Sequence, residues 1–149
     1  MLKIFLANTN LNNPDQFLSN LNTFITVDVA SKNLDSKILV DDRMKANYIV
    51  YILNQNCDFG TIANYIEDSC KRGKRILSCI VTDDFSMSVS DIHSDKLEQL
   101  ENRLRDSLGH ASMVAKNNGA RHFNFVSDLI EFLNQAYQIL EENKNELHS

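Results

Sequence analysis

Short apolar runs alternate along the chain with stretches in which apolar residues recur every three or four positions. The short runs predict β-strands, because they are brief and rich in β-branched and aromatic residues. One of them, Asn47–Leu53, has almost no polar break, as expected of a central parallel strand covered on both faces. The five predicted strands are Lys3–Ala7, Thr23–Val29, Asn47–Leu53, Arg75–Val81 and Arg121–Val126.

The stretches between these runs predict helices, each with an apolar face. Their starts carry the usual signals, an Asn followed by Pro or a capping Ser. Three of the predicted helices have both ends defined: Ser36 to about Lys45, Thr61 to about Arg72, and Asp95 to Val114. For two more, only the start is predicted, at Asn13-Pro14 and at Ser127. The Asp95–Val114 helix carries a leucine stripe, Leu97, Leu100, Leu104 and Leu108, which is typical of a core but is also compatible with an oligomer interface.

The regular alternation of strand and helix predicts the architecture. Successive strand–helix–strand units form right-handed crossovers and a parallel sheet. We therefore expect one domain over residues 1–149, a flavodoxin-like three-layer α/β/α sandwich with a five-stranded sheet in the order 2-1-3-4-5. Ligands of such sheets bind beyond the carboxyl ends of the strands, where the strand order reverses between strands 1 and 3. The loops expected there are Asn8–Asn10 and Gln55–Thr61.

Composition and charge limit the kinds of binding partner that the sequence predicts. The 149 residues are 43% hydrophobic and 23% charged, with a net charge of -5, which is ordinary for a globular domain. The negative sign argues against nucleic-acid polymers and anionic membranes as main partners, since both require clustered basic residues. The brief basic run Lys71–Arg75 is interpreted as a solvated helix end. No apolar run approaches the length of a membrane span.

Cysteine and histidine spacing gives no sign of a metal or redox centre. The three cysteines are odd in number and lack a CxxC pair, and the chain opens directly on a strand-like segment without a signal peptide. We interpret them as inert thiols of a cytoplasmic protein. The four histidines show no ligand spacing, and no Gly-rich nucleotide motif is present, so the sequence predicts neither metal nor cofactor.

The segment DFGTIAN, residues 58–64, places a carboxylate, a glycine and a hydroxyl just before a helix. Free N–H groups at such a start can hold an anion or a sugar hydroxyl. The alternative is that Asp58 and Thr61 only cap the helix while Gly60 allows the turn. From spacing alone, the capping alternative is favoured.

Several segments in register resemble the nucleoside 2-deoxyribosyltransferase family. DFGTIAN is similar to the family's Asp-x-Gly-Thr-x-x-Glu motif, and KIFLA is similar to its first strand. Residues 46–52 are similar to its third strand, and residues 61–72 to the helix that follows. Near the C-terminus, Asn118-Gly119-Ala120 and the helix ending in Phe132-Leu133-Asn134 match the family's pattern, so that the resemblance covers nearly the whole chain.

The resemblance implies a glycosyl-transfer site in which a Glu attacks the anomeric carbon of a deoxynucleoside. Here Asn64 stands at that position, so the implied nucleophile is an uncharged amide. Asp58 matches the Asp of the family's turn. The implied substrate-binding residues are Asn8, Thr9, Asn47, Gly60, Thr61 and Asp68, with Asn8 in place of a glycine and Asn47 in place of an Asp.

These replacements leave three hypotheses. The favoured one is a degenerate relative that binds a nucleoside, nucleotide or nucleotide-derived ligand, because Asn64 can hydrogen-bond a sugar but is a poor nucleophile. The second is an active N-glycosidic transferase or hydrolase that uses another carboxylate, Asp58 or Asp68. For Glu67 and Asp68 we prefer the interpretation of a solvated helix face. The third is a non-catalytic interaction module, since relatives of this kind commonly form homo-oligomers.

Overall fold

The computed structural model describes residues 1–7, 14–30, 43–54, 57–81 and 94–147, and these include one five-stranded sheet. All neighbouring strands are parallel, in the order β2-β1-β3-β4-β5. The predicted fold and strand order are confirmed. The strands are β1 (Lys3–Leu6), β2 (Thr26–Val29), β3 (Tyr48–Leu53), β4 (Ile76–Ile80) and β5 (Arg121–Phe123).

The helices follow the predicted pattern with shifted ends. A single 3-10 turn, η1, joins α3 to β4. Of the helix predicted from Ser36, residues 43–45 are helical and residues 36–42 lie outside the described residues. The helices are α1 (Pro14–Ser19), α3 (Phe59–Arg72), η1 (Gly73–Arg75), α4 (Ser94–Asn117) and α5 (Val126–Leu147).

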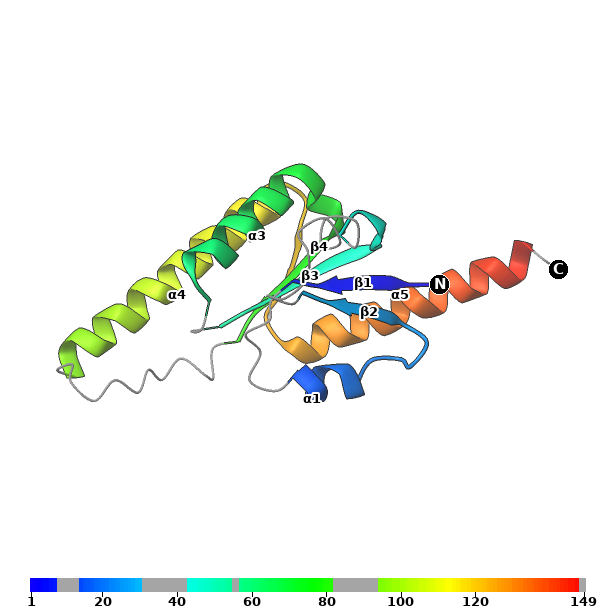
Figure 1. Cartoon of the computed structure of the whole chain (residues 1–149), viewed down its shortest axis with the longest axis horizontal. Helices are drawn as coiled ribbons and strands as arrows, with labels where there is room; N and C mark the ends of the chain where they lie inside the picture. The colour runs from blue at the N-terminus through cyan, green and yellow to red at the C-terminus, as the bar shows by residue number, and fades with distance from the viewer. Residues whose placement is uncertain (8–13, 31–42, 55–56, 82–93, 148–149) are drawn as a thin grey trace.

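The sheet is the middle of three layers (Figure 1). On one face α3 and α4 bury Tyr65, Leu108 and Ala111 against the strands. On the other face α1 and α5 contribute Phe17, Leu129 and Leu133. Because β3 is covered on both sides, five of its six residues are buried, which explains its unbroken apolar sequence.

The second strand begins three residues later than predicted. Asn22 forms a turn just before it, in which its Oδ1 accepts the N–H of Phe24 at 2.9 Å and its carbonyl accepts the N–H of Ile25 at 3.0 Å. These bonds withdraw residues 23–25 from the ladder with β1. The β-branched residues of the sequence do not reveal that these turn hydrogen bonds compete with strand pairing.

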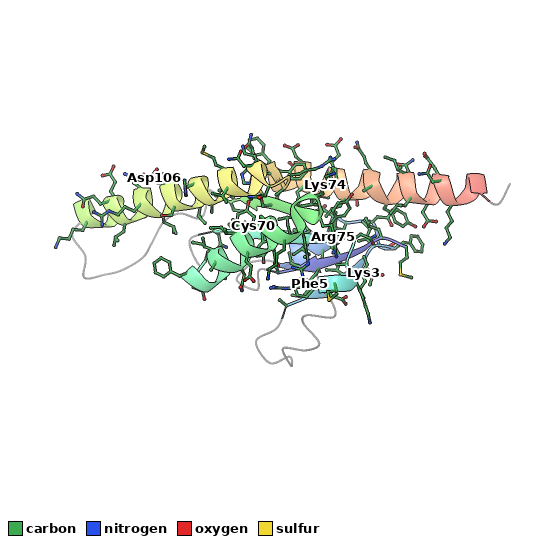
Figure 2. The ribbon with its side chains drawn as sticks, turned by 90° about the horizontal axis from the view of Figure 1, so that it is seen from above. Lys3, Phe5, Cys70, Lys74, Arg75 and Asp106 are labelled. Atoms are coloured by element: carbon green, nitrogen blue, oxygen red, sulfur yellow. The ribbon has the colours of Figure 1, made fainter. Side chains whose placement is uncertain are left out.

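Helix α4 is longer than the sheet it covers, and its first half projects past the carboxyl ends of the strands (Figure 1). Leu108 is fully buried, but Leu100 keeps 42% of its surface exposed. Figure 2 shows Asp106 near the middle of α4. The interpretation of the stripe as core is therefore correct for Leu108 and wrong for Leu100. Self-association through this helix stays a prediction.

Two glycines permit a close backbone approach at the amino edge of the sheet. A Cβ on Gly73 would lie 1.6 Å from the carbonyl oxygen of Asn118, so no side chain fits there. Gly119 has φ 97°, a left-handed conformation that favours glycine. The two glycines pack the end of α3 against the turn from α4 to β5. Within the described ranges, no helix has both the length and the apolar character needed to cross a bilayer.

Candidate functional site

Helix α3 begins at the carboxyl edge of β3, beside β1, where the strand order reverses. Asp58 has extended backbone angles, and its Oδ1 accepts the N–H of Thr61 at 2.7 Å. This is the N-cap that the sequence predicted. The amides of Phe59 and Gly60 belong to the first turn, whose N–H groups have no acceptor within the helix. The start of α3 therefore offers hydrogen-bond donors at the predicted ligand-binding edge.

Gly60 does not provide a turn of unusual conformation. It lies inside the first turn of α3, and the positive-φ residue in the described part of the chain is Gly119. A Cβ on Gly60 would lie 3.4 Å from Asp58 Oδ1, a contact at the edge of ordinary packing. The prediction that Gly60 allows a turn before the helix is therefore wrong. Its bare Cα instead leaves room beside the capping carboxylate.

Asn64 lies in the second turn of α3 and its side chain is exposed. Asn64 is not among the residues that line three cavities found on the described part of the chain. Asn8 and Thr9, which follow β1 in the sequence, lie outside the described residues, as do residues 82–93. Of the predicted set, the structure brings together Asp58, Gly60, Thr61 and Asn64 on one helical segment.

Asp68 faces the protein interior, contrary to the predicted solvated face. Its Oδ2 accepts the Tyr51 hydroxyl at 2.5 Å and lies 3.5 Å from Nη1 of Arg43. Its Oδ1 accepts Nη1 of Arg72 at 3.2 Å. The residue is only 3% exposed. Burial and the adjacent carboxylate raise the pKa of Tyr51 far above its ordinary range, so that the phenol stays protonated and donates to Asp68.

These contacts define a group of four residues, here called the Asp68 cluster: Arg43, Tyr51, Asp68 and Arg72. The cluster connects the segment before β3 to α3 and to β3 itself. A cavity of about 250 Å³ lies beside the cluster, lined also by Glu67 and Lys71. Both oxygens of Asp68 are already engaged, so the carboxylate is held as an acceptor and is poorly placed to attack a substrate. The cluster is best explained as a structural tie.

Glu67 behaves as the sequence predicted. It is exposed and pairs with Lys71 one turn further along α3, with 2.6 Å between Oε1 and Nζ. Its hydrogen bond to Lys71 lowers the pKa of the Glu67 carboxyl. The interpretation of a solvated helix face is confirmed for Glu67.

Asn47 lies at the opposite edge of the sheet from α3's first turn. It directly precedes β3, and its Oδ1 accepts the N–H of Lys3 at 2.9 Å. The six residues of β3 separate it from the carboxyl edge by about 20 Å. The prediction that Asn47 shares a ligand site with Asn64 is therefore wrong. A residue before a strand and a residue after it cannot meet when the strand is extended.

At this amino edge Asn47 lines a cavity of about 540 Å³, here called the amino-edge cavity, together with Lys74, Arg121 and the apolar side of α5. The basic run Lys71–Arg75 is accordingly more than a solvated helix end. Arg72 belongs to the Asp68 cluster, and Arg75 Nη2 donates to the carbonyl oxygens of residues 43, 44 and 46. Sequence reasoning missed this cavity, because its walls come from five separate segments.

A buried hydrogen-bonded chain crosses the α3 side of the sheet and was also missed. The Ser78 hydroxyl lies 2.7 Å from Tyr65 Oη and 2.8 Å from His122 Nδ1. Burial lowers the pKa of His122, and burial raises the pKa of Tyr65. Ser78 is completely buried, so this Ser–His pair is closed to substrates. A serine inside an otherwise apolar strand was the available signal.

The cysteines are separate from one another. Cys79 is buried, and burial raises the pKa of its thiol to about 12, so it is inert as a thiolate. Cys57 is half-buried and its Sγ accepts the N–H of Asn54 at 3.3 Å, while Cys70 is exposed. Over the described part of the chain, no three His, Cys, Asp or Glu side chains gather as a metal site would require.

Comparisons with known proteins support the fold but do not identify an activity. No model of a protein family matches the chain, and no curated protein matches it. Among solved structures, it is similar to a conserved protein from Enterococcus faecalis V583, with a TM-score of 0.50 and 16% identity over 91% of this chain and 99% of that one. At this identity the likeness shows the fold alone. The chain is thus a flavodoxin-like three-layer α/β sandwich.

Proposed function

We propose that this protein is nucleoside 2-deoxyribosyltransferase-like and binds a nucleoside or nucleotide at the carboxyl edge of β1 and β3, without transferring the sugar. One observation carries the proposal: α3 starts with Asp58, Thr61 and Asn64 at the point where the strand order reverses. Ligands of open parallel sheets bind at this point. The resemblance of residues 58–64 to the family's motif supplies the ligand class.

Loss of turnover follows from the chemistry of the side chains. The Asn64 amide carries no charge and is a weak nucleophile toward carbon, but it can donate to and accept from a sugar hydroxyl. Neither alternative carboxylate is free. Asp58 accepts the Thr61 amide, and both oxygens of Asp68 are held by Tyr51, Arg43 and Arg72. An active enzyme that uses either carboxylate is therefore the less favoured alternative.

Isothermal titration with adenosine, 2′-deoxyadenosine and their 5′-monophosphates tests the proposal, with chromatography of each mixture to detect released adenine. The same panel is repeated for guanine, cytosine and thymine compounds. We expect binding of at least one compound and no free base. Free base in any mixture would favour the active enzyme, and no heat with any compound would refute the proposed ligand class.

Variants then test the assignment of Asn64. Asn64→Ala should weaken the best ligand about three- to tenfold, since one neutral hydrogen bond contributes about 0.5–1.5 kcal/mol. Glu67→Gln, three residues along the same helix on its solvated side, should leave binding unchanged. Equal losses in both variants would argue that Asn64 does not contact the ligand.

A further inference from the structure

The amino-edge cavity lies at the opposite end of the sheet from the proposed nucleotide site. One wall is apolar and comes mainly from α5, where Ile139 is 57% exposed and Leu140 is 41% exposed. Its volume of about 540 Å³ is within the range of small-molecule sites. The apolar lining residues are Leu2, Tyr48, Phe132, Ala136, Ile139 and Leu140.

The other wall is cationic. Lys74, Arg75 and Arg121 line it, and no Asp or Glu is among the described residues around the cavity. Arg75 is occupied by backbone carbonyl oxygens, so it contributes charge rather than free donors. Lys74 and Arg121 form no ion pair within the described part of the chain. In a protein with a net charge of -5, this wall is an unneutralised positive surface.

Packing positions the Arg121 side chain and the backbone of Lys74. The guanidinium carbon of Arg121 lies 4.9 Å from the centre of the Phe132 ring, a cation–π contact. Lys74 follows the close approach of Gly73 to Asn118, and a Cβ on Gly119 would touch its Cγ at 3.6 Å. Figure 2 shows Lys74 and Arg75 together just beyond the end of α3.

We infer that the amino-edge cavity binds a small organic anion, whose apolar body packs on α5 and whose acidic group pairs with Lys74 and Arg121. The apolar wall would hold a ring or short aliphatic chain, because burial of apolar surface there removes Ile139 and Leu140 from water. The two cations select a carboxylate, sulfonate or phosphate over a neutral group.

NMR titration of the ¹⁵N-labelled full chain tests this inference. The probes are 2-naphthalenesulfonate and its neutral counterpart 2-naphthylmethanol, which share one ring system. We expect the sulfonate to shift the amides of Tyr48, Gly119 and Arg121, to leave Asp58–Asn64 unchanged, and to bind at least about tenfold more tightly than the alcohol. Shifts centred on residues 58–64, or equal affinity for both probes, would overturn the inference.

Matched variants separate a specific site from general attraction of anions. Arg121→Gln and Lys74→Gln should each weaken the sulfonate about three- to tenfold. Lys71→Gln removes the same charge from the exposed face of α3 and should leave the affinity unchanged. The spectra themselves show that each variant is folded. Equal weakening by all three variants would mean that only net charge matters, and would contradict a built site.

Discussion

Asp68 carries two ion pairs and a hydrogen bond at a position that solvent hardly reaches. Removing one partner from such a cluster leaves the others desolvated and unpaired, which costs more than the pair contributes. Its partners Arg43 and Arg72 keep about a quarter of their side-chain surface exposed, so that the penalty falls below that of a fully buried cluster.

Replacement of Asp68 by Asn should therefore lower the free energy of unfolding by about 2–4 kcal/mol. Urea unfolding followed by circular dichroism measures the change. Glu67→Gln is the control, because it alters a neighbouring exposed carboxylate and should have little effect. Full stability of the Asp68 variant would show that the cluster is not a structural tie.

We expect His122 to make the stability of the fold depend on pH. Burial and the nearby Lys116 lower the pKa of His122 below its ordinary value of 6.5. As pH falls through 6.5 the unfolded chain binds the proton before the folded chain does, so the stability contributed by neutral His122 is present above that pH and is lost below it.

The variant His122→Asn, which retains a polar group near Ser78, should unfold with a weaker dependence on pH between 7 and 5 than the natural chain. Thermal unfolding at half-unit pH steps gives the comparison. An unchanged pH slope in the variant would show that His122 titrates equally in both states.

At the scale of elements, the glycines test the packing directly. Gly73→Ala would force a methyl group into the carbonyl of Asn118 and should destabilise the fold by about 3 kcal/mol or more. Gly109→Ala makes the same chemical change inside α4, where no described atom other than the adjacent backbone of the helix lies within 4 Å of the new Cβ.

Gly109→Ala should therefore stabilise the fold by about 0.5–1 kcal/mol through the better helix propensity of alanine. Chemical denaturation of the two variants and the natural chain measures the sign of each change in the free energy of unfolding. If both variants changed the free energy of unfolding in the same direction, the close packing of Gly73 against Asn118 would be contradicted.

Helices and strands can be predicted from the sequence where burial produces a local pattern of apolar residues. The run Tyr48–Leu53 is apolar because helices cover both of its faces, so it identifies itself as the central strand. The place of Asp68 could not be predicted, because its partners Arg43 and Tyr51 come from other segments. The family resemblance does not reveal that Asn47 lies far from Asn64, because β3 places the residues before it and after it at opposite edges of the sheet.

At the scale of the whole molecule, the sheet separates the two proposed ligand sites, which differ in chemistry. The carboxyl edge presents the first turn of α3, with hydrogen-bond donors and the neutral amide of Asn64. The amino edge presents an apolar wall opposite unpaired cations. Figure 1 shows α4 extending beyond the first edge and α5 beyond the second, so that each edge has a helix flanking it. The two sites can be tested independently, since about 20 Å of β3 lies between them.

The carboxyl-edge site is tested most directly by mapping where a nucleotide binds. Addition of the tightest nucleoside or nucleotide to the ¹⁵N-labelled protein should shift the amides of residues 58–64, leave Gly73 and Gly119 unchanged, and release no base over the same period. A nucleotide that shifts only the amino-edge residues, or one that is cleaved while it is bound, would contradict a silent nucleotide site at the start of α3.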